Sequence, residues 1–255
     1  WWVCASPIIC SRFSSARSKV VGQDSFKGMG VDFGDLDGDG LTVIFVSNLT
    51  SEALQENHFA FLGTGETARM RDGHAPFIDR GDELGVAHSG WAWDAKIVDF
   101  DNDGVSELVQ AVGFWRGEVS RWPELEELAM ENDGLMRRPW SWPQFSPDSD
   151  LSGREKMPFY VRKGEHFVNI NRELGLDQPQ VTRGIAVADV DGDGDLDYAI
   201  ANQWDTSWMI RNECPGCGGF LGLHLRVPLR PAPMAIRAGH PGATDATRPA
   251  IGAQA

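Results

Sequence analysis

The chain has 255 residues, a hydrophobic fraction of 42% and a formal net charge of −14. Its composition is typical of a folded globular protein rather than a disordered one. The acidity argues against a nucleic-acid backbone as a partner, and no apolar run approaches the roughly 20 residues of a membrane-spanning helix.

The N-terminal residues 1–21 are interpreted as a fragment or an isolated strand. The chain begins with Trp1 rather than Met, which favours a processed or partial chain. The next segment, "GMGVDFGD" at 28–35, is short, apolar and bounded by turn residues, as strands are. High glycine and proline contents favour an all-β fold with many turns.

An acidic nine-residue segment follows this strand and occurs three times in the chain. The copies are "DLDGDGLTV" at 35–43, "DFDNDGVSE" at 99–107 and "DVDGDGDLD" at 189–197. A short apolar segment rich in Val, Ile and Ala stands on each side of every copy. Two flanking stretches, "FIDRGDELGV" at 77–86 and "FVNINRELGL" at 167–176, also match each other. This pattern predicts a repeated unit of strand, acidic loop and strand.

The acidic segments have the spacing of a calcium-binding loop. Carboxylates at positions 1, 3 and 5, a carbonyl at position 7 and a carboxylate at position 9 supply oxygen ligands, and glycine at position 6 allows a sharp turn. The first loop has Val43 at position 9, so we expect it to bind more weakly than the other two. The predicted ligands of up to three calcium ions are Asp35, Asp37, Asp39, Leu41, Asp99, Asp101, Asp103, Val105, Glu107, Asp189, Asp191, Asp193, Asp195 and Asp197.

Two alternatives share part of this spacing. An EF-hand requires a glutamate at position 12 and flanking helices, whereas position 12 is Val46, Gln110 or Ile200 and the flanks predict strands. The other alternative is a set of Asp/Gly-rich turns without metal, because both residues favour turns. The same spacing in all three copies favours calcium over that alternative.

A tryptophan-rich insertion at 114–158 separates the second repeat from the third. Its segment "PELEELAMEN" at 123–132 predicts a helix with proline at the first position. Tryptophans in the insertion are candidates for stacking on sugar rings or anchoring a protein partner, and the alternative is that they cover strand edges. The candidates are Trp115, Trp122, Trp140 and Trp142. We expect Trp91, Trp93, Trp204 and Trp208 in the core.

The cysteines and histidines carry weaker signals. "CPGC" at 214–217 is compatible with a disulfide, half of a zinc site or a redox pair, and Cys4 and Cys10 lie far away in sequence. The six histidines show no zinc-protease spacing, and no nucleophile motif accompanies them. We therefore expect no catalytic residues.

The acidic loops resemble the FG-GAP (VCBS-type) repeats of integrin-α β-propellers. The stretch "RGIAVADVDGDGDLDYAIAN" at 183–202 is most similar to the cartilage acidic protein or ASPIC/UnbV branch, and "TRPAIGA" at 247–253 resembles its C-terminal motif. The resemblance implies a β-propeller at 22–212, partial and of about four blades. It also implies the beginning of an ASPIC/UnbV-like β domain at 213–255 and calcium at the loops.

The resemblance further implies a secreted protein, extracellular or periplasmic, with an adhesion or binding role toward protein or carbohydrate. Such a module has no nucleic-acid partner and no membrane span, and the rest of a larger propeller is a further candidate partner. Two other functions stay open: the scaffold of a polysaccharide-acting hydrolase or lyase, and a structural repeat that supports a neighbouring domain.

Overall fold

The computed structural model describes residues 27–50, 56–131, 134, 137–222, 226–228 and 247–249. The proposed N-terminal segment 1–21, Cys4, Cys10 and most of the 213–255 region lie outside these residues. The chain divides into two compact units, of which the first ends at Gly218. Among the described residues of the second unit, β14 (Arg226–Pro228) pairs antiparallel with β15 (Thr247–Pro249).

The first unit is mostly β-structure, with three antiparallel sheets and few helices, which confirms the β-rich prediction. In each sheet, strands follow one another in chain order from one edge to the other. The first sheet contains β1 (Gly30–Gly34), β2 (Val43–Ser47), β3 (Phe59–Gly63) and β4 (Phe77–Asp79). The second contains β5 (Ala92–Val98), β6 (Glu107–Val112), β9 (Phe159–Lys163) and β10 (His166–Asn169). The third contains β11 (Thr182–Ala188), β12 (Asp197–Asn202) and β13 (Trp208–Ile210).

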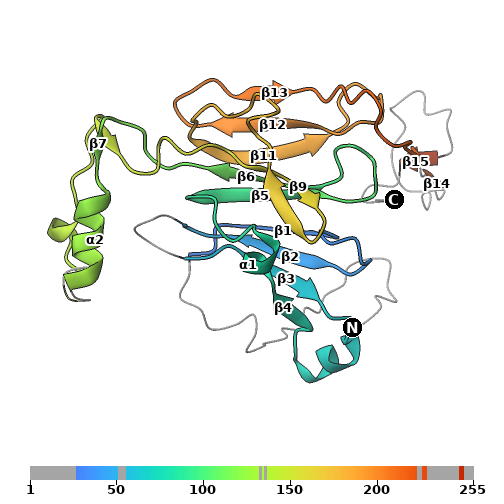
Figure 1. Ribbon diagram of the computed structural model, residues 1–255, viewed down its shortest axis with the longest axis horizontal. Helices are drawn as coiled ribbons and strands as arrows, with labels where there is room; N and C mark the ends of the chain where they lie inside the picture. The colour runs from blue at the N-terminus through green and yellow to red at the C-terminus, as the bar shows by residue number, and fades with distance from the viewer. Residues whose placement is uncertain are drawn as a thin grey trace, which may run out of the picture. The chain divides into compact units, whose positions relative to one another are not determined.

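The three sheets stack, with β5 between β1 and β11 (Figure 1). Carboxylates on the first strands join neighbouring sheets. Asp32 of β1 accepts the Ile97 N–H of β5 at 2.8 Å, and Asp94 of β5 accepts the Ile185 N–H of β11 at 3.0 Å. β5 and β11 are edge strands of their sheets, and these bonds satisfy backbone N–H groups of those edges.

The core lies between the sheets and consists of two apolar layers. One layer packs the first sheet on the second through residues such as Phe45, Leu108 and Tyr160. The other packs the second sheet on the third through residues such as Val109 and Ile200. All six residues of β6 are buried because both faces of the second sheet are covered, whereas β2 alternates between buried and half-buried positions.

The link between successive sheets repeats, as the matching sequence stretches predict. After β4, the short helix α1 (Gly81–Leu84) ends at Gly85, whose φ of 78° is left-handed. After β10, a turn ends at Gly175 with a φ of 71°. Both turns have the same three backbone hydrogen bonds, spanning four, three and five residues. The "ELG" motif is therefore a helical turn with a glycine terminator that redirects the chain into the next sheet.

The insertion connects β6 to β9 and contains the predicted helix. α2 (Trp122–Glu131) begins one residue earlier than predicted, and its proline lies in the first turn, where its missing N–H costs nothing. Besides α2, the insertion contains β7 (Val119–Ser120), β8 (Ser149–Asp150) and the 3-10 turn η2 (Pro139–Ser141). Outside the insertion, another 3-10 turn, η1 (Thr67–Asp72), precedes β4. No described helix is long and apolar enough to cross a membrane.

Candidate metal centres

Three acidic loops connect the first and second strands of the three sheets. We call them loop 1 (35–43), loop 2 (99–107) and loop 3 (189–197). The hairpin register is the same in each, because the residue before the loop pairs with loop position 9. The pairs are Gly34 with Val43, Val98 with Glu107, and Ala188 with Asp197. The repeat in sequence is thus a repeat in backbone geometry.

The first aspartate of each loop organises the turn. One carboxylate oxygen accepts the N–H of the glycine at position 6, at 2.9 Å in loop 1, 3.0 Å in loop 2 and 3.1 Å in loop 3. The aspartate at position 5 likewise accepts the N–H of position 7 in every loop. Two left-handed residues make this turn possible, at position 6 and at position 4. Position 4 is Gly38, Asn102 or Gly192, with φ of 73°, 55° and 81°. These residue types adopt that conformation most readily.

Carboxylate oxygens converge in each loop to within 4.8 Å of one another. The groups are Asp35, Asp37 and Asp39 in loop 1, then Asp99, Asp101 and Glu107 in loop 2, and Asp189, Asp191 and Asp197 in loop 3. These groups contain nine of the predicted ligands. The carboxylates of Asp103 and Asp193 belong to the same loops but not to these side-chain groups. The predicted carbonyl ligands are the position 7 residues Leu41, Val105 and Asp195.

Burial and charge crowding act on the acids of loops 1 and 2. In loop 1, burial and the neighbouring aspartates raise the pKa of Asp37, and its Oδ1 is buried with no hydrogen-bond partner among the described residues. In loop 2, burial and repulsion from the three aspartates raise the pKa of Glu107 to about 7. Glu107 also accepts the Phe100 N–H at 2.8 Å, which fixes its carboxyl over the loop.

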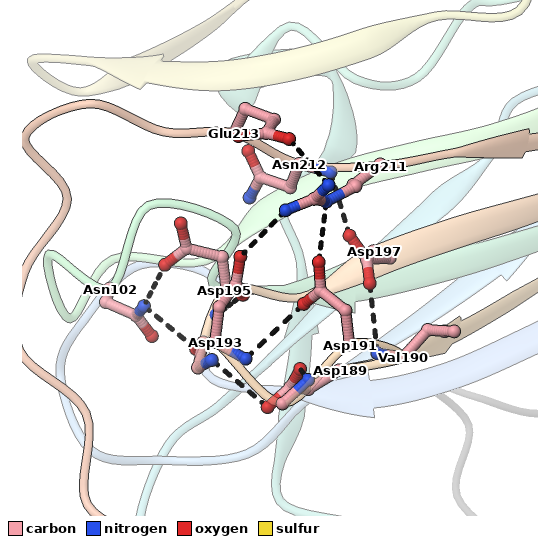
Figure 2. A network of polar contacts seen from close by, with 12 residues as sticks. Asn102, Asp189, Val190, Asp191, Asp193, Asp195, Asp197, Arg211, Asn212 and Glu213 are labelled. Carbon is pink, nitrogen blue, oxygen red and sulfur yellow. Dashed lines mark hydrogen bonds and ion pairs between the residues drawn. The ribbon is translucent and has the colours of Figure 1, made fainter.

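Loop 3 contains a cation of the protein itself (Figure 2). Arg211 lies just after β13, and its Nε is 2.6 Å from Asp191 Oδ2, while its Nη1 is 3.0 Å from Glu213 Oε1. Asp197 accepts the N–H groups of Val190 at 2.9 Å and Asn212 at 2.8 Å, and these bonds lower its pKa. The sequence pattern alone gave no indication that an arginine would approach this loop.

The donor chemistry of all three loops fits calcium. Carboxylate oxygens are hard ligands that calcium prefers, and the hydrogen bonds of the first aspartate hold each turn in the required shape. The unpartnered Asp37 Oδ1 is an acceptor for which a cation would provide a partner. Loop 1 lacks an acid at position 9, where Val43 is buried in the core, as the sequence predicts.

An aromatic cluster forms on the side of the insertion. Phe114 stacks on Trp91 with ring centroids 4.3 Å apart, and Trp115 packs edge-on against Trp204 at 4.9 Å. Arg183 lies over Trp93 at 4.2 Å and donates to the Gly113 and Phe114 carbonyls. The cluster connects the insertion to β5 and β11.

The structure places the candidate tryptophans at different depths. The ring centroids of Trp122 and Trp91 are 6.1 Å apart. Trp115 is half-buried, whereas Trp140 and Trp142 are exposed. The prediction that Trp204 lies in the core is wrong, because its side chain is 57% exposed. Trp204 follows β12 in a turn and has a left-handed φ of 66°, which directs its ring outward over Trp115. Trp208 packs against the second core layer as expected.

A histidine and a serine meet in the interior, which sequence spacing did not reveal. His58 is fully buried; its Nδ1 accepts the Asn48 N–H at 2.9 Å, and its Nε2 lies 2.6 Å from Ser89 Oγ. Burial lowers the pKa of His58 to about 3, so the ring is neutral and its proton is on Nε2. Ser89 Oγ therefore accepts from His58 and donates to Gln110 Oε1. A histidine in this tautomer does not accept the serine proton.

Comparisons with known proteins add no assignment. A scan against protein-family models finds no match, and a search of curated proteins finds no significant relative.

Proposed function

We propose that the chain is part of a calcium-stabilised β-propeller of the FG-GAP/VCBS type that serves as a non-catalytic interaction module outside the cytoplasm. The observation that carries the proposal is the repetition of one acidic hairpin in three successive sheets. Each hairpin has the same register and the same left-handed positions, and in each the first aspartate accepts the N–H of position 6. The carboxylates that converge in each of these hairpins would find a common ligand in a divalent cation.

Calcium would act by removing repulsion within each hairpin. The raised pKa values of Asp37, Asp101 and Glu107 show that these carboxylates are unfavourable in their ionised form without a counter-charge. An ion bound only by the folded state adds stability by mass action. Loop 2 is the strongest candidate, because it has an acid at position 9 and makes no ion pair among the described residues. Loop 3 must exchange its guanidinium for the ion.

The expected stabilisation follows from the affinity of extracellular calcium modules, whose dissociation constants are roughly 10⁻⁴–10⁻³ M. At ten times the dissociation constant, each occupied site adds about 1.4 kcal/mol, or roughly 3–6 °C in melting temperature. We expect calcium to raise the melting temperature of the full chain and a chelator to reverse the rise. Magnesium, which prefers a smaller octahedral site, should do less.

Variants identify the loops that bind. Asp101→Asn should reduce the calcium-dependent shift more than Asp37→Asn, because loop 2 has the more complete ligand set. Glu165→Gln, an exposed acid outside the loops, is the control and should leave the shift unchanged. Equal melting temperatures with calcium and with chelator would refute the proposal.

The interaction surface we propose is centred on Trp204, Trp115 and Phe145. Trp204 and Phe145 are 57% and 39% exposed, and Trp115 contacts both rings. Two left-handed residues other than glycine, Trp204 and Ser152, adjoin Trp115, and such conformations persist where a function requires them. The Arg116–Asp205 ion pair at 2.7 Å borders the same surface with polar groups. A flat ring beside polar groups suits a sugar ring or a protein loop.

Affinity electrophoresis through gels containing neutral polysaccharides tests the glycan form of this proposal. Retardation of the wild-type chain should be lost in Trp204→Ala and kept in Trp208→Phe, whose ring belongs to the core. A serine-type hydrolase built on the His58–Ser89 contact is disfavoured, because Nε2 carries the proton and Nδ1 already accepts the Asn48 N–H. Equal retardation of both variants would place binding elsewhere.

A further inference from the structure

Residues 211–218 connect loops 2 and 3, and we call this segment the strap. At its beginning, Arg211 pairs with Asp191 of loop 3 at 2.6 Å. Asn212 then reaches both loops: its N–H donates to Asp197 at 2.8 Å, and its Nδ2 donates to the Phe100 carbonyl at 2.6 Å. The strap thus bonds with the ends of two hairpins that belong to different sheets. Figure 2 shows its contacts with loop 3, where Arg211 and Asn212 lie beside Asp191 and Asp197.

The end of the strap is fixed to loop 2. The Gly218 N–H donates to the Asp101 carbonyl at 2.8 Å. The fit is close, because a Cβ on Gly218 would lie 1.7 Å from the Asn102 carbonyl oxygen. Asn102 in turn donates from Nδ2 to the Gly194 carbonyl and the Asp195 carboxylate, both at 3.2 Å. Loops 2 and 3 are therefore joined twice, through the strap and through Asn102.

A disulfide between Cys214 and Cys217 closes the middle of the strap. It forms the tight turn that brings Cys217 and Gly218 back to loop 2, where Cys217 Sγ lies 3.9 Å from the Phe100 carbonyl oxygen. Both cysteines are half-buried, so a small reductant can reach them. Without the disulfide, the turn loses its covalent closure and the chain gains conformational entropy.

We propose that the strap is a redox-controlled latch that makes loops 2 and 3 one structural unit and leaves loop 1 independent. A dithiol reductant opens it. One thiolate of the dithiol attacks a cysteine sulfur, the S–S bond breaks, and a mixed disulfide forms; the second thiol then closes the reductant into a cyclic disulfide. The two electrons and two protons remain on the Cys214 and Cys217 thiols. The latch confines the assembled form of the two loops to oxidising surroundings.

Amide hydrogen exchange of the full chain, followed by mass spectrometry, tests the latch without any added cation. Peptides that cover 35–43, 99–107 and 189–197 report the three loops separately. On treatment with dithiothreitol, we expect exchange in loops 2 and 3 to accelerate together by about tenfold, as the loss of one or two hydrogen bonds implies. Loop 1 is the internal control and should be unchanged.

Two variants separate the latch from other effects of reduction. Cys214→Ser/Cys217→Ser should exchange like the reduced wild type and should not respond further to the reductant. Gly218→Ala, which keeps the disulfide but clashes with Asn102, should accelerate both loops, whereas Gly219→Ala, with open space at its Cβ, should not. Unchanged loops, acceleration of only one, or equal acceleration of all three would overturn the latch. Because no cation takes part, that result would leave the calcium proposal standing.

Discussion

Glu155 offers a quantitative test of the packing between the insertion and the second sheet. Its carboxylate accepts the Trp91 N–H at 2.7 Å. The carboxylate also packs closely against Gly90, because a Cβ on Gly90 would lie only 2.4 Å from Glu155 Oε2. Burial raises the pKa of Glu155 from 4.5 to about 7. The folded state therefore binds the Glu155 proton more tightly than the unfolded state does. The contribution of this group to the free energy of unfolding is fully present below pH 4.5 and is lost as the pH rises through 7.

The magnitude of that loss is about 3 kcal/mol, since one pKa unit corresponds to about 1.4 kcal/mol. Glu155→Gln keeps an acceptor for the Trp91 N–H but carries no charge at any pH. Urea unfolding of both proteins at pH 5 and pH 8 should show the variant gaining about 3 kcal/mol relative to wild type at the higher pH. Glu165→Gln, an exposed acid, should show no such gain. A stability difference between Glu155→Gln and wild type that is the same at both pH values would contradict the raised pKa of Glu155.

Three further predictions concern the core and its polar contacts. Leu108→Ala should lower the free energy of unfolding by about 3–5 kcal/mol because Leu108 is fully buried. Val31 is 55% exposed, so Val31→Ala should lower it by under about 1 kcal/mol. Similar losses in the two variants would contradict the two-layer core. Nitrogen NMR should find His58 neutral with its proton on Nε2 at pH 5, and a protonated ring there would be incompatible with its burial. Arg183→Lys should lower the free energy of unfolding by about 2 kcal/mol, because an ammonium cannot make the three hydrogen bonds of the guanidinium. An unchanged midpoint of urea unfolding would count against these three hydrogen bonds.

Sequence patterns predicted the β-strands and acidic loops well because these features are local. Strand flanks, the glycine at position 6 and the "ELG" turn each follow from the chemistry of a few neighbouring residues. The second strand of each hairpin begins at loop position 9, as the apolar segments indicate. The left-handed position 4 also has a local signal, because Gly38, Asn102 and Gly192 are residue types that adopt this conformation readily.

Contacts between distant segments were not predictable in this way. Arg211 is 20 residues from Asp191 in sequence, and nothing in its own neighbourhood indicates an approach to loop 3. His58 and Ser89 meet because β3 and the turn before β5 fold together, which no spacing rule records. The prediction for Trp204 is wrong because apolar character predicts burial, whereas the left-handed backbone of Trp204 turns its ring outward.

We propose above that divalent cations neutralise the crowded carboxylates of the three loops. Anomalous diffraction from crystals grown in millimolar calcium tests it most directly. We expect peaks at the loops, with carboxylate oxygens roughly 2.3–2.6 Å from each ion and loop 2 at the highest occupancy. Carboxylates turned toward solvent around empty loops, in calcium-saturated crystals, would contradict it.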